Sequence, residues 1–157
     1  STDKAVIREL SPPLYYDFYT LGIVLKFKGG DSNVNVEEME YTEEQEPEPI
    51  LHATAHLLLH AAMMIIGSES QNIDGLVDGS YNTAVLYDYS MNGGNGFSKA
   101  IFDNLESIFT RAYGIVDQCK CKKDEGCPRC TNYDGCNRFN AFLNKNGAKE
   151  RLKQFKV

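Results

Sequence analysis

Five cysteines, all between residues 119 and 136, carry the clearest chemistry in this 157-residue sequence. The first four form two closely spaced pairs, Cys119-Lys-Cys121 and Cys127-Pro-Arg-Cys130. A Cys-x-x-Cys turn lets two thiolates converge on one ion while backbone amides point at the sulfurs, and a Cys-x-Cys pair can also chelate. Four thiolates form the closed tetrahedral shell of structural zinc, which has no open position for a reacting water. The spacing therefore predicts a structural Zn²⁺ site formed by these four residues.

Two other chemistries fit the same thiols. An iron–sulfur cluster also uses four cysteines, and a Cys-x-x-Cys pair can form a redox disulfide. The fifth cysteine, Cys136, either replaces Cys119 or Cys121 as a ligand or remains a buried free thiol. Disulfide-stapled secreted domains usually spread their cysteines along the chain, so this clustering favours a metal site in a reducing compartment. We therefore expect the protein to be cytoplasmic.

The charge of the chain is unevenly distributed. Residues 1–118 carry six Lys or Arg against eighteen Asp or Glu, whereas residues 119–157 carry ten against four. Clustered cations are what phosphate binding requires. The same cations could instead be solvated or could offset the negative charge of a tetrathiolate site. The predicted nucleic-acid contacts are Lys120, Lys122, Lys123, Arg129 and Arg138.

Three histidines recur every four residues in an apolar segment, at positions 52, 56 and 60. The zinc-protease helix needs a Glu beside its first histidine as general base, and Ala53 stands there, so protease chemistry is not expected. Such a stripe is typical of hydrogen-bonded core or interface residues. A second metal site or a proton-linked site is the alternative.

A glycine-rich stretch, Asn92-Gly-Gly-Asn-Gly96, follows a predicted strand and opens a predicted helix. Its glycines either permit tight strand-to-helix packing or leave amides free for a phosphate or a neighbouring domain. The stretch lacks the Lys-Ser or Lys-Thr of a Walker A motif and the spacing of a dinucleotide fingerprint. No ATP-dependent motor and no nucleophile with its base can be identified, so whether the chain is part of an enzyme stays open.

Hydrophobic patterning and turn residues predict the elements that position these groups. One side of the first strand should carry Leu21, Ile23, Leu25 and Phe27. Pro49 and Gly67 bound the first helix. The predicted elements are a strand within 14–27, a largely buried helix over 50–66, a strand over 84–89, an amphipathic helix over 97–118 and a short basic helix over 148–155.

The length fits a single domain, residues 1–157, of the α+β (or α/β) class. Its small sheet should pack with a buried histidine helix and a long amphipathic helix, beside a cysteine-rich zinc loop. The histidines interrupt the longest apolar run, which argues against a membrane span, and no secretory signal is visible. The expected parts are a β-rich segment 1–30, an acidic loop 31–49, an α/β core 50–118, a zinc loop 119–136 and a basic tail or helix 137–157.

Three pieces of this sequence resemble one known family. They are the His52-Ala-Thr-Ala-His56 helix with its exit through Gly67 to Gly75, the Val85-Leu-Tyr-Asp88 strand with the Gly93-Gly94 turn, and the four-cysteine signature. The family is the Mrf-type zinc-binding domain, formerly a domain of unknown function, at the C-terminus of DEAD/DEAH-box superfamily 2 DNA-repair helicases. Its members usually have Glu where Ala55 stands, and the spacer 122–126 is slightly longer than usual.

The resemblance implies a zinc-binding accessory domain of an ATP-dependent DNA helicase, which helps to hold or guide the strand. Its partners would be DNA and helicase motor domains, on a preceding segment or on another chain. The alternative is a free-standing zinc-stabilised interaction module of a DNA repair or defence complex, and a small enzyme using the histidines or the glycine loop comes third. Within the matching pieces, contact or packing roles are expected for His52, His56, Asp88, Gly93 and Gly94.

Overall fold

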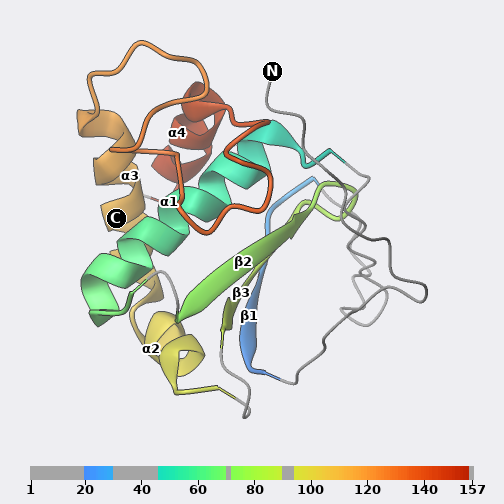
Figure 1. The fold of residues 1–157 in the computed structure, drawn as a ribbon, viewed down its shortest axis with the longest axis vertical. Coiled ribbons are helices and arrows are strands. Elements are labelled where there is room, and N and C mark those ends of the chain that lie inside the picture. Colours follow the sequence, from blue (N-terminus) through green and yellow to red (C-terminus); the bar gives the residue numbers. More distant parts are fainter. Residues whose placement is uncertain (1–19, 30–45, 70–71, 90–93, 156–157) are drawn as a thin grey trace, which may run out of the picture.

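The computed structural model describes residues 20–29, 46–69, 72–89 and 94–155. Within these ranges the chain forms a three-stranded antiparallel sheet and four helices, which confirms the predicted α+β class (Figure 1). The strand order is β1-β3-β2, so β3 is central. The elements in chain order are β1 (Gly22–Lys26), α1 (Pro49–Ile66), β2 (Ile73–Asp78), β3 (Thr83–Asp88), α2 (Phe97–Asp103), α3 (Leu105–Gln118) and α4 (Lys145–Lys153).

Helix α1 is the centre of the core, because it packs against β2 on one side and against α3 and α4 on the other (Figure 1). Its bounds confirm the predicted helix: Pro49 stands in the first turn and Gly67 ends it in the left-handed conformation (φ 68°). The Glu48 carboxylate caps the helix by accepting hydrogen bonds from the backbone N–H groups of Ile50 and Leu51. By length and composition alone α1 could cross a membrane, yet 61% of it is buried inside the fold.

Strand β1 presents a buried face in part as predicted. Leu25 and Phe27 are buried and Ile23 packs against the core, but Leu21 lies before the strand with 58% of its surface exposed. Residues 14–19 of the predicted strand and most of the acidic loop lie outside the described residues. Strand β2 was missed from the sequence because Asp and Gly, which strands disfavour, occupy half of its positions.

The predicted helix over 97–118 is wrong in one respect, since it is broken at Asn104 into α2 and α3. The Asn104 side chain donates to the Ala100 carbonyl at 2.8 Å, which competes with regular helical hydrogen bonding. The apolar spacing from Ile101 to Ile108 continues through the break, and both side chains are fully buried. Periodicity therefore identified the buried face but not the interruption.

The chain between α3 and α4, residues 119–144, contains turns but no helix or strand. Its second half passes along α1, as the orange-red trace in Figure 1 shows. We call residues 119–144 the cysteine loop. The short basic helix predicted over 148–155 is confirmed as α4, which begins three residues earlier and is capped by the Asn144 side chain.

Candidate metal centre

The two predicted cysteine pairs come together at the start of the cysteine loop. Cys119 directly follows the last residue of α3 in an extended conformation, and Cys121 stands two residues further on. Cys127 and Cys130 share one tight turn, closed by the Cys130 N–H donating to the Cys127 carbonyl at 2.9 Å. Cys130 is fully buried and the other three are half-buried, so the site lies at the edge of the core.

The sulfur separations fit a single tetrahedral ion. The Sγ–Sγ distance is 3.6 Å for Cys119 and Cys127 and 3.8 Å for Cys121 and Cys130, and all four sulfurs lie within 4.8 Å of one another. With bonds of about 2.3 Å from zinc to sulfur, the edge of a tetrahedral shell is about 3.8 Å. The cysteines of an iron–sulfur cluster ligate several iron atoms and therefore stand farther apart. The geometry favours one ion such as Zn²⁺.

Lys145, the first residue of α4, places a buried ammonium against this group. Its Nζ donates to the carbonyls of Cys119 (3.0 Å) and Cys121 (2.7 Å) and to the Cys121 Sγ (3.2 Å). Burial disfavours the ammonium, but the hydrogen bond and the charge of Cys121 outweigh it and raise the pKa of Lys145. No pattern in the sequence marked Lys145, because its role depends on how α4 packs.

The thiols of the group differ in their electrostatic environment. Burial raises the pKa of the Cys130 thiol to about 12. Burial acts in the same direction on Cys121, but the hydrogen bond from Lys145 overcomes it and lowers the pKa of that thiol to about 7. One cation therefore favours the thiolate form that a metal ligand needs.

The middle of the chain, which includes the four cysteines up to Cys130, matches a known protein family. Residues 54–131 match the family model of the MrfA Zn-binding domain. These residues form a MrfA zinc-binding domain. The family resemblance in the sequence is thereby confirmed, and both the family description and the four-sulfur geometry indicate zinc.

Two crystal structures share the fold of this MrfA zinc-binding domain and its surroundings. One is the DUF1998 helicase MrfA bound to DNA, which matches 92% of the chain with a TM-score of 0.63 and 19% identity. The other is that helicase bound to DNA and AMPPNP, with 86% of the chain matched, a TM-score of 0.54 and 18% identity. The chain spans 18% and 15% of those helicase chains. Among curated proteins there is no match.

Gly126 is required by the turn that carries the second cysteine pair of the MrfA zinc-binding domain. It has a left-handed φ of +95°, and a Cβ there would overlap the Thr131 hydroxyl and come within 3.0 Å of the Cys130 Sγ. That hydroxyl donates to the Glu125 carbonyl, and the Cys127 N–H donates to the Cys130 Sγ at 3.3 Å. A side chain at position 126 would therefore disturb both the turn and a sulfur.

The Gly126→Ala variant is expected to lower the melting temperature of the zinc-loaded chain and to weaken zinc binding. The left-handed conformation alone costs Ala about 1–2 kcal/mol, and the overlap adds to it. Thermal unfolding and competition with a chelator measure the two effects. Gly114→Ala is the matched control: it lies within α3 with nothing near its Cβ position and should stabilise by about 0.5–1 kcal/mol. Equal changes in the two variants would contradict the assignment.

The histidine stripe of α1 faces the second half of the cysteine loop. The Nδ1 atoms of His52 and His56 lie 3.0 Å and 2.7 Å from the carbonyls of Phe142 and Thr131. The Nε2 of His60 lies 2.5 Å from the Asn132 carbonyl. Hydrogen bonds from the three rings thus hold the cysteine loop against the central helix.

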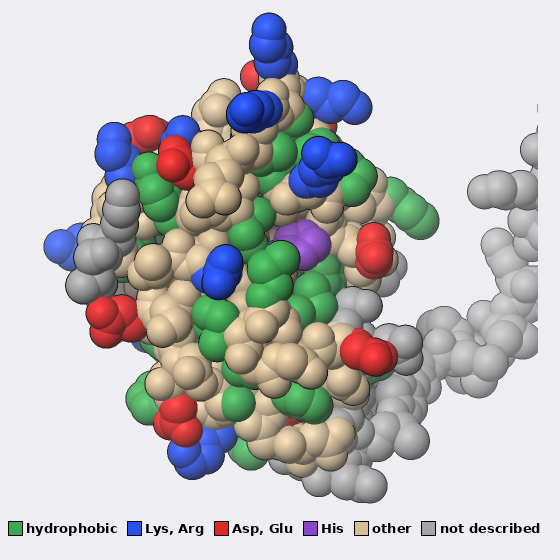
Figure 2. All heavy atoms as spheres, turned by 90° about the vertical axis from the view of Figure 1, so that its left-hand side faces the viewer, with side chains coloured by type: hydrophobic (Ala, Val, Ile, Leu, Met, Phe, Trp, Pro, Cys, Tyr) green, Lys and Arg blue, Asp and Glu red, His purple; other side chains and the backbone are tan. Residues whose placement is uncertain are grey.

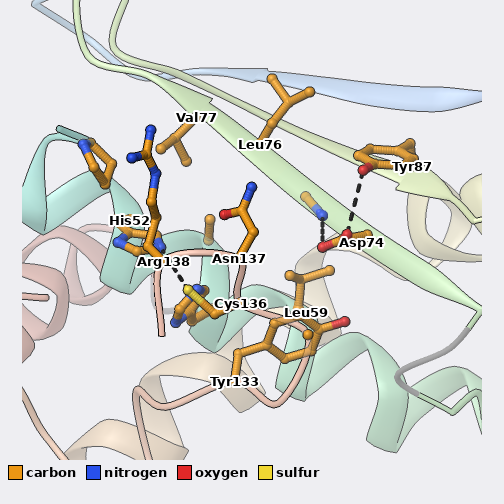
Figure 3. A pocket seen from close by; sticks show the side chains of 15 residues that line it. His52, Leu59, Asp74, Leu76, Val77, Tyr87, Tyr133, Cys136, Asn137 and Arg138 are labelled. Atoms are coloured by element: carbon orange, nitrogen blue, oxygen red, sulfur yellow. Dashed lines mark hydrogen bonds between the residues drawn. The ribbon is translucent and has the colours of Figure 1, made fainter. Parts of the chain in front are cut away.

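Cys136 is placed with these histidines and not with the other four cysteines. Its Sγ lies 3.5 Å from the His52 Nε2 and within 4.8 Å of a ring nitrogen of His56. The thiol borders a small cavity that is also lined by Asp74 and Tyr87 of the sheet (Figure 3). Burial raises the pKa of both Asp74 and Tyr87.

The Asp88–Gly94 pair has a packing role in the structure. The Asp88 carboxylate is fully buried and accepts from the Ser98 N–H at the first turn of α2, a favourable place for a negative charge. Gly94 has a φ of +92°, and a Cβ there would come within 2.6 Å of the Asp88 Oδ2. Gly93 lies outside the described residues.

The predicted cations divide between two places. Lys120 and Arg129 line a surface hollow beside the metal centre, together with Cys119, Cys121 and Cys127. Lys122 and Lys123 are exposed on the same loop, whereas Arg138 lines the other cavity, beside His52 and Cys136. The structure therefore places Lys120 and Arg129 at this hollow and Arg138 at the other cavity.

Proposed function

We propose that the chain is a zinc-binding accessory domain, or subunit, of an ATP-dependent DNA helicase, and that it helps to hold or guide the strand. The shared fold is the main support, since 92% of the chain matches part of a helicase that was crystallised with DNA. That part is 18% of the helicase, so motor domains would be supplied by the same polypeptide or by a partner. A role in DNA repair follows from the same proposal.

The zinc would be structural. Four protein sulfurs complete a tetrahedral shell and leave no position for a reacting water. Bound there, the ion would tie the end of α3 to the turn at Cys127–Cys130 and, through Lys145, to α4. Such thiols persist in reduced form in a reducing compartment, which supports a cytoplasmic location.

The DNA contact would lie at the outer edge of this centre. Lys and Arg side chains gather toward the upper end of the face in Figure 2. In the cysteine loop, Lys120 and Arg129 line the hollow beside the sulfurs, and Lys122 and Lys123 are exposed. A fixed loop that presents clustered cations suits a phosphate backbone, because such contacts position a strand without selecting its sequence.

Anisotropy of a labelled single-stranded oligonucleotide with the zinc-loaded chain tests this contact at several salt concentrations. The double variant Lys122→Glu/Lys123→Glu should bind more weakly and with a flatter salt dependence. The slope of log K against log salt should become shallower by about 0.7 for each phosphate that the protein no longer neutralises.

The double variant Lys28→Glu/Lys153→Glu is the matched control, because both lysines are exposed outside the cysteine loop and the change in net charge is the same. An equal loss of affinity in both variants would mean that only net charge matters. The absence of salt-dependent DNA binding in the parent chain would contradict the proposed contact. A full-length gene product, and gene neighbours, without a Walker A motif and a DEAD/DEAH box would contradict the helicase assignment.

A further inference from the structure

A second group of metal-ligating side chains lies apart from the four cysteines. His52 and His56 stand one turn apart on α1, are 7% and 4% exposed, and have ring centroids 4.3 Å apart. Cys136 approaches them from the cysteine loop. One ligand atom from each of the three residues lies within 4.8 Å of the other two. Figure 3 shows the thiol directed at the His52 ring.

The hydrogen bonds of the two rings fix where their lone pairs are. A backbone carbonyl only accepts, so the Nδ1 atoms that face Phe142 and Thr131 must carry protons. In the neutral ring the Nε2 atom then keeps its lone pair. Burial lowers the pKa of both histidines, that of His56 to about 3, so both rings are neutral at physiological pH. A metal-ligating histidine typically donates its other N–H to a carbonyl in this way.

We propose that the Nε2 atoms of His52 and His56 and the Sγ of Cys136 form a second metal site, for a divalent ion of borderline softness such as Zn²⁺. In a tetrahedral zinc shell the bonds are about 2.0–2.1 Å to nitrogen and 2.3 Å to sulfur, so a nitrogen ligand and a sulfur ligand lie about 3.6 Å apart. The distance between the Cys136 Sγ and the His52 Nε2 is 3.5 Å. An imidazole pair with one thiolate is a donor set that zinc accepts.

The surroundings suit a neutral His52 and an open fourth position. The guanidinium of Arg138 lines the same cavity, where its positive charge disfavours a charged His52. The cavity holds about 100 Å³, room for a few waters at about 30 Å³ each. One of them would complete the shell that the three protein ligands leave open. The ion would join α1 to the middle of the cysteine loop.

Metal content of the zinc-loaded chain, measured with a thiol titration as the protein standard, tests the second site. The parent chain should hold about two zinc ions, and both His56→Asn and Cys136→Ser should hold about one. The Asn amide can replace the Nδ1–H that donates to Thr131 while it removes the Nε2 ligand. His60→Gln, which keeps a donor for the Asn132 carbonyl, is the control and should retain both ions.

X-ray absorption at the zinc edge of the parent chain gives an answer that needs no variant. Two sites predict a mixed shell in which nitrogen and oxygen scatterers accompany sulfur, whereas the four-cysteine centre alone gives sulfur only. A sulfur-only shell with about one zinc per chain would overturn the second site and leave the proposed function untouched. Two ions in the parent chain with no loss in either variant would overturn the ligand assignment.

Discussion

Removing the metal from the four-cysteine centre is expected to abolish the cooperative unfolding transition of the native chain. Zinc binding in small structural sites contributes about 10–16 kcal/mol, whereas a whole domain is stable by about 5–15 kcal/mol. The cysteine loop has no helix or strand of its own, and four sulfurs within 4.8 Å of one another would repel as thiolates without a cation. The histidines of α1 form hydrogen bonds with this loop. Unfolding of the loop would therefore also remove contacts of the central helix.

Thermal unfolding followed by circular dichroism, with and without a zinc-selective chelator under reducing conditions, measures this effect. Cys130→Ser should reproduce the effect of the chelator, since the fully buried sulfur cannot be replaced by another thiol nearby. Cys136→Ser, a change of the same kind outside this centre, should cost less. A transition that survives both the chelator and Cys130→Ser with its midpoint unchanged would show that the metal does not maintain the fold.

Lys145→Met is expected to weaken zinc binding at the four-cysteine centre by about 10- to 100-fold, the usual cost of losing a residue that supports metal ligands. Methionine fills a similar volume but leaves the carbonyls of Cys119 and Cys121 without their donor and the Cys121 sulfur without its cation. Competition between the chain and a chromophoric zinc chelator measures the affinity.

Lys149→Met provides the comparison on the same helix. Lys149 forms an ion pair with Asp117 at 2.8 Å, and neither side chain is buried, so its loss should leave zinc affinity unchanged. If the two variants bind zinc equally well, Lys145 supports α4 alone and not the metal centre.

The four-cysteine group could be predicted because chelation by short cysteine pairs is local. Two ligands separated by one or two residues converge through a single turn, whatever the rest of the chain does. Helix α1 could be predicted for the same reason, since Pro49 and Gly67 mark the first turn and the end of the helix through local backbone preferences. These features need no knowledge of tertiary packing.

Features that depend on distant segments could not be obtained in the same way. Cys136 meets His52 across 84 residues, and Lys145 meets Cys121 across 24, so spacing gave no indication of either pairing. The break at Asn104 was hidden because the buried positions keep their helical spacing across it. Strand β2 is specified by its antiparallel register with β3 more than by its own composition.

The long separations of the histidine contacts have a consequence for synthesis on the ribosome. Helix α1 is made first, but the carbonyls that its histidines bond to follow 72 to 90 residues later. At about 5–20 residues per second, that delay is roughly 4–18 s. During this time a largely apolar helix lacks the segments that cover it, so we expect the nascent chain to depend on chaperones until the last helix has emerged.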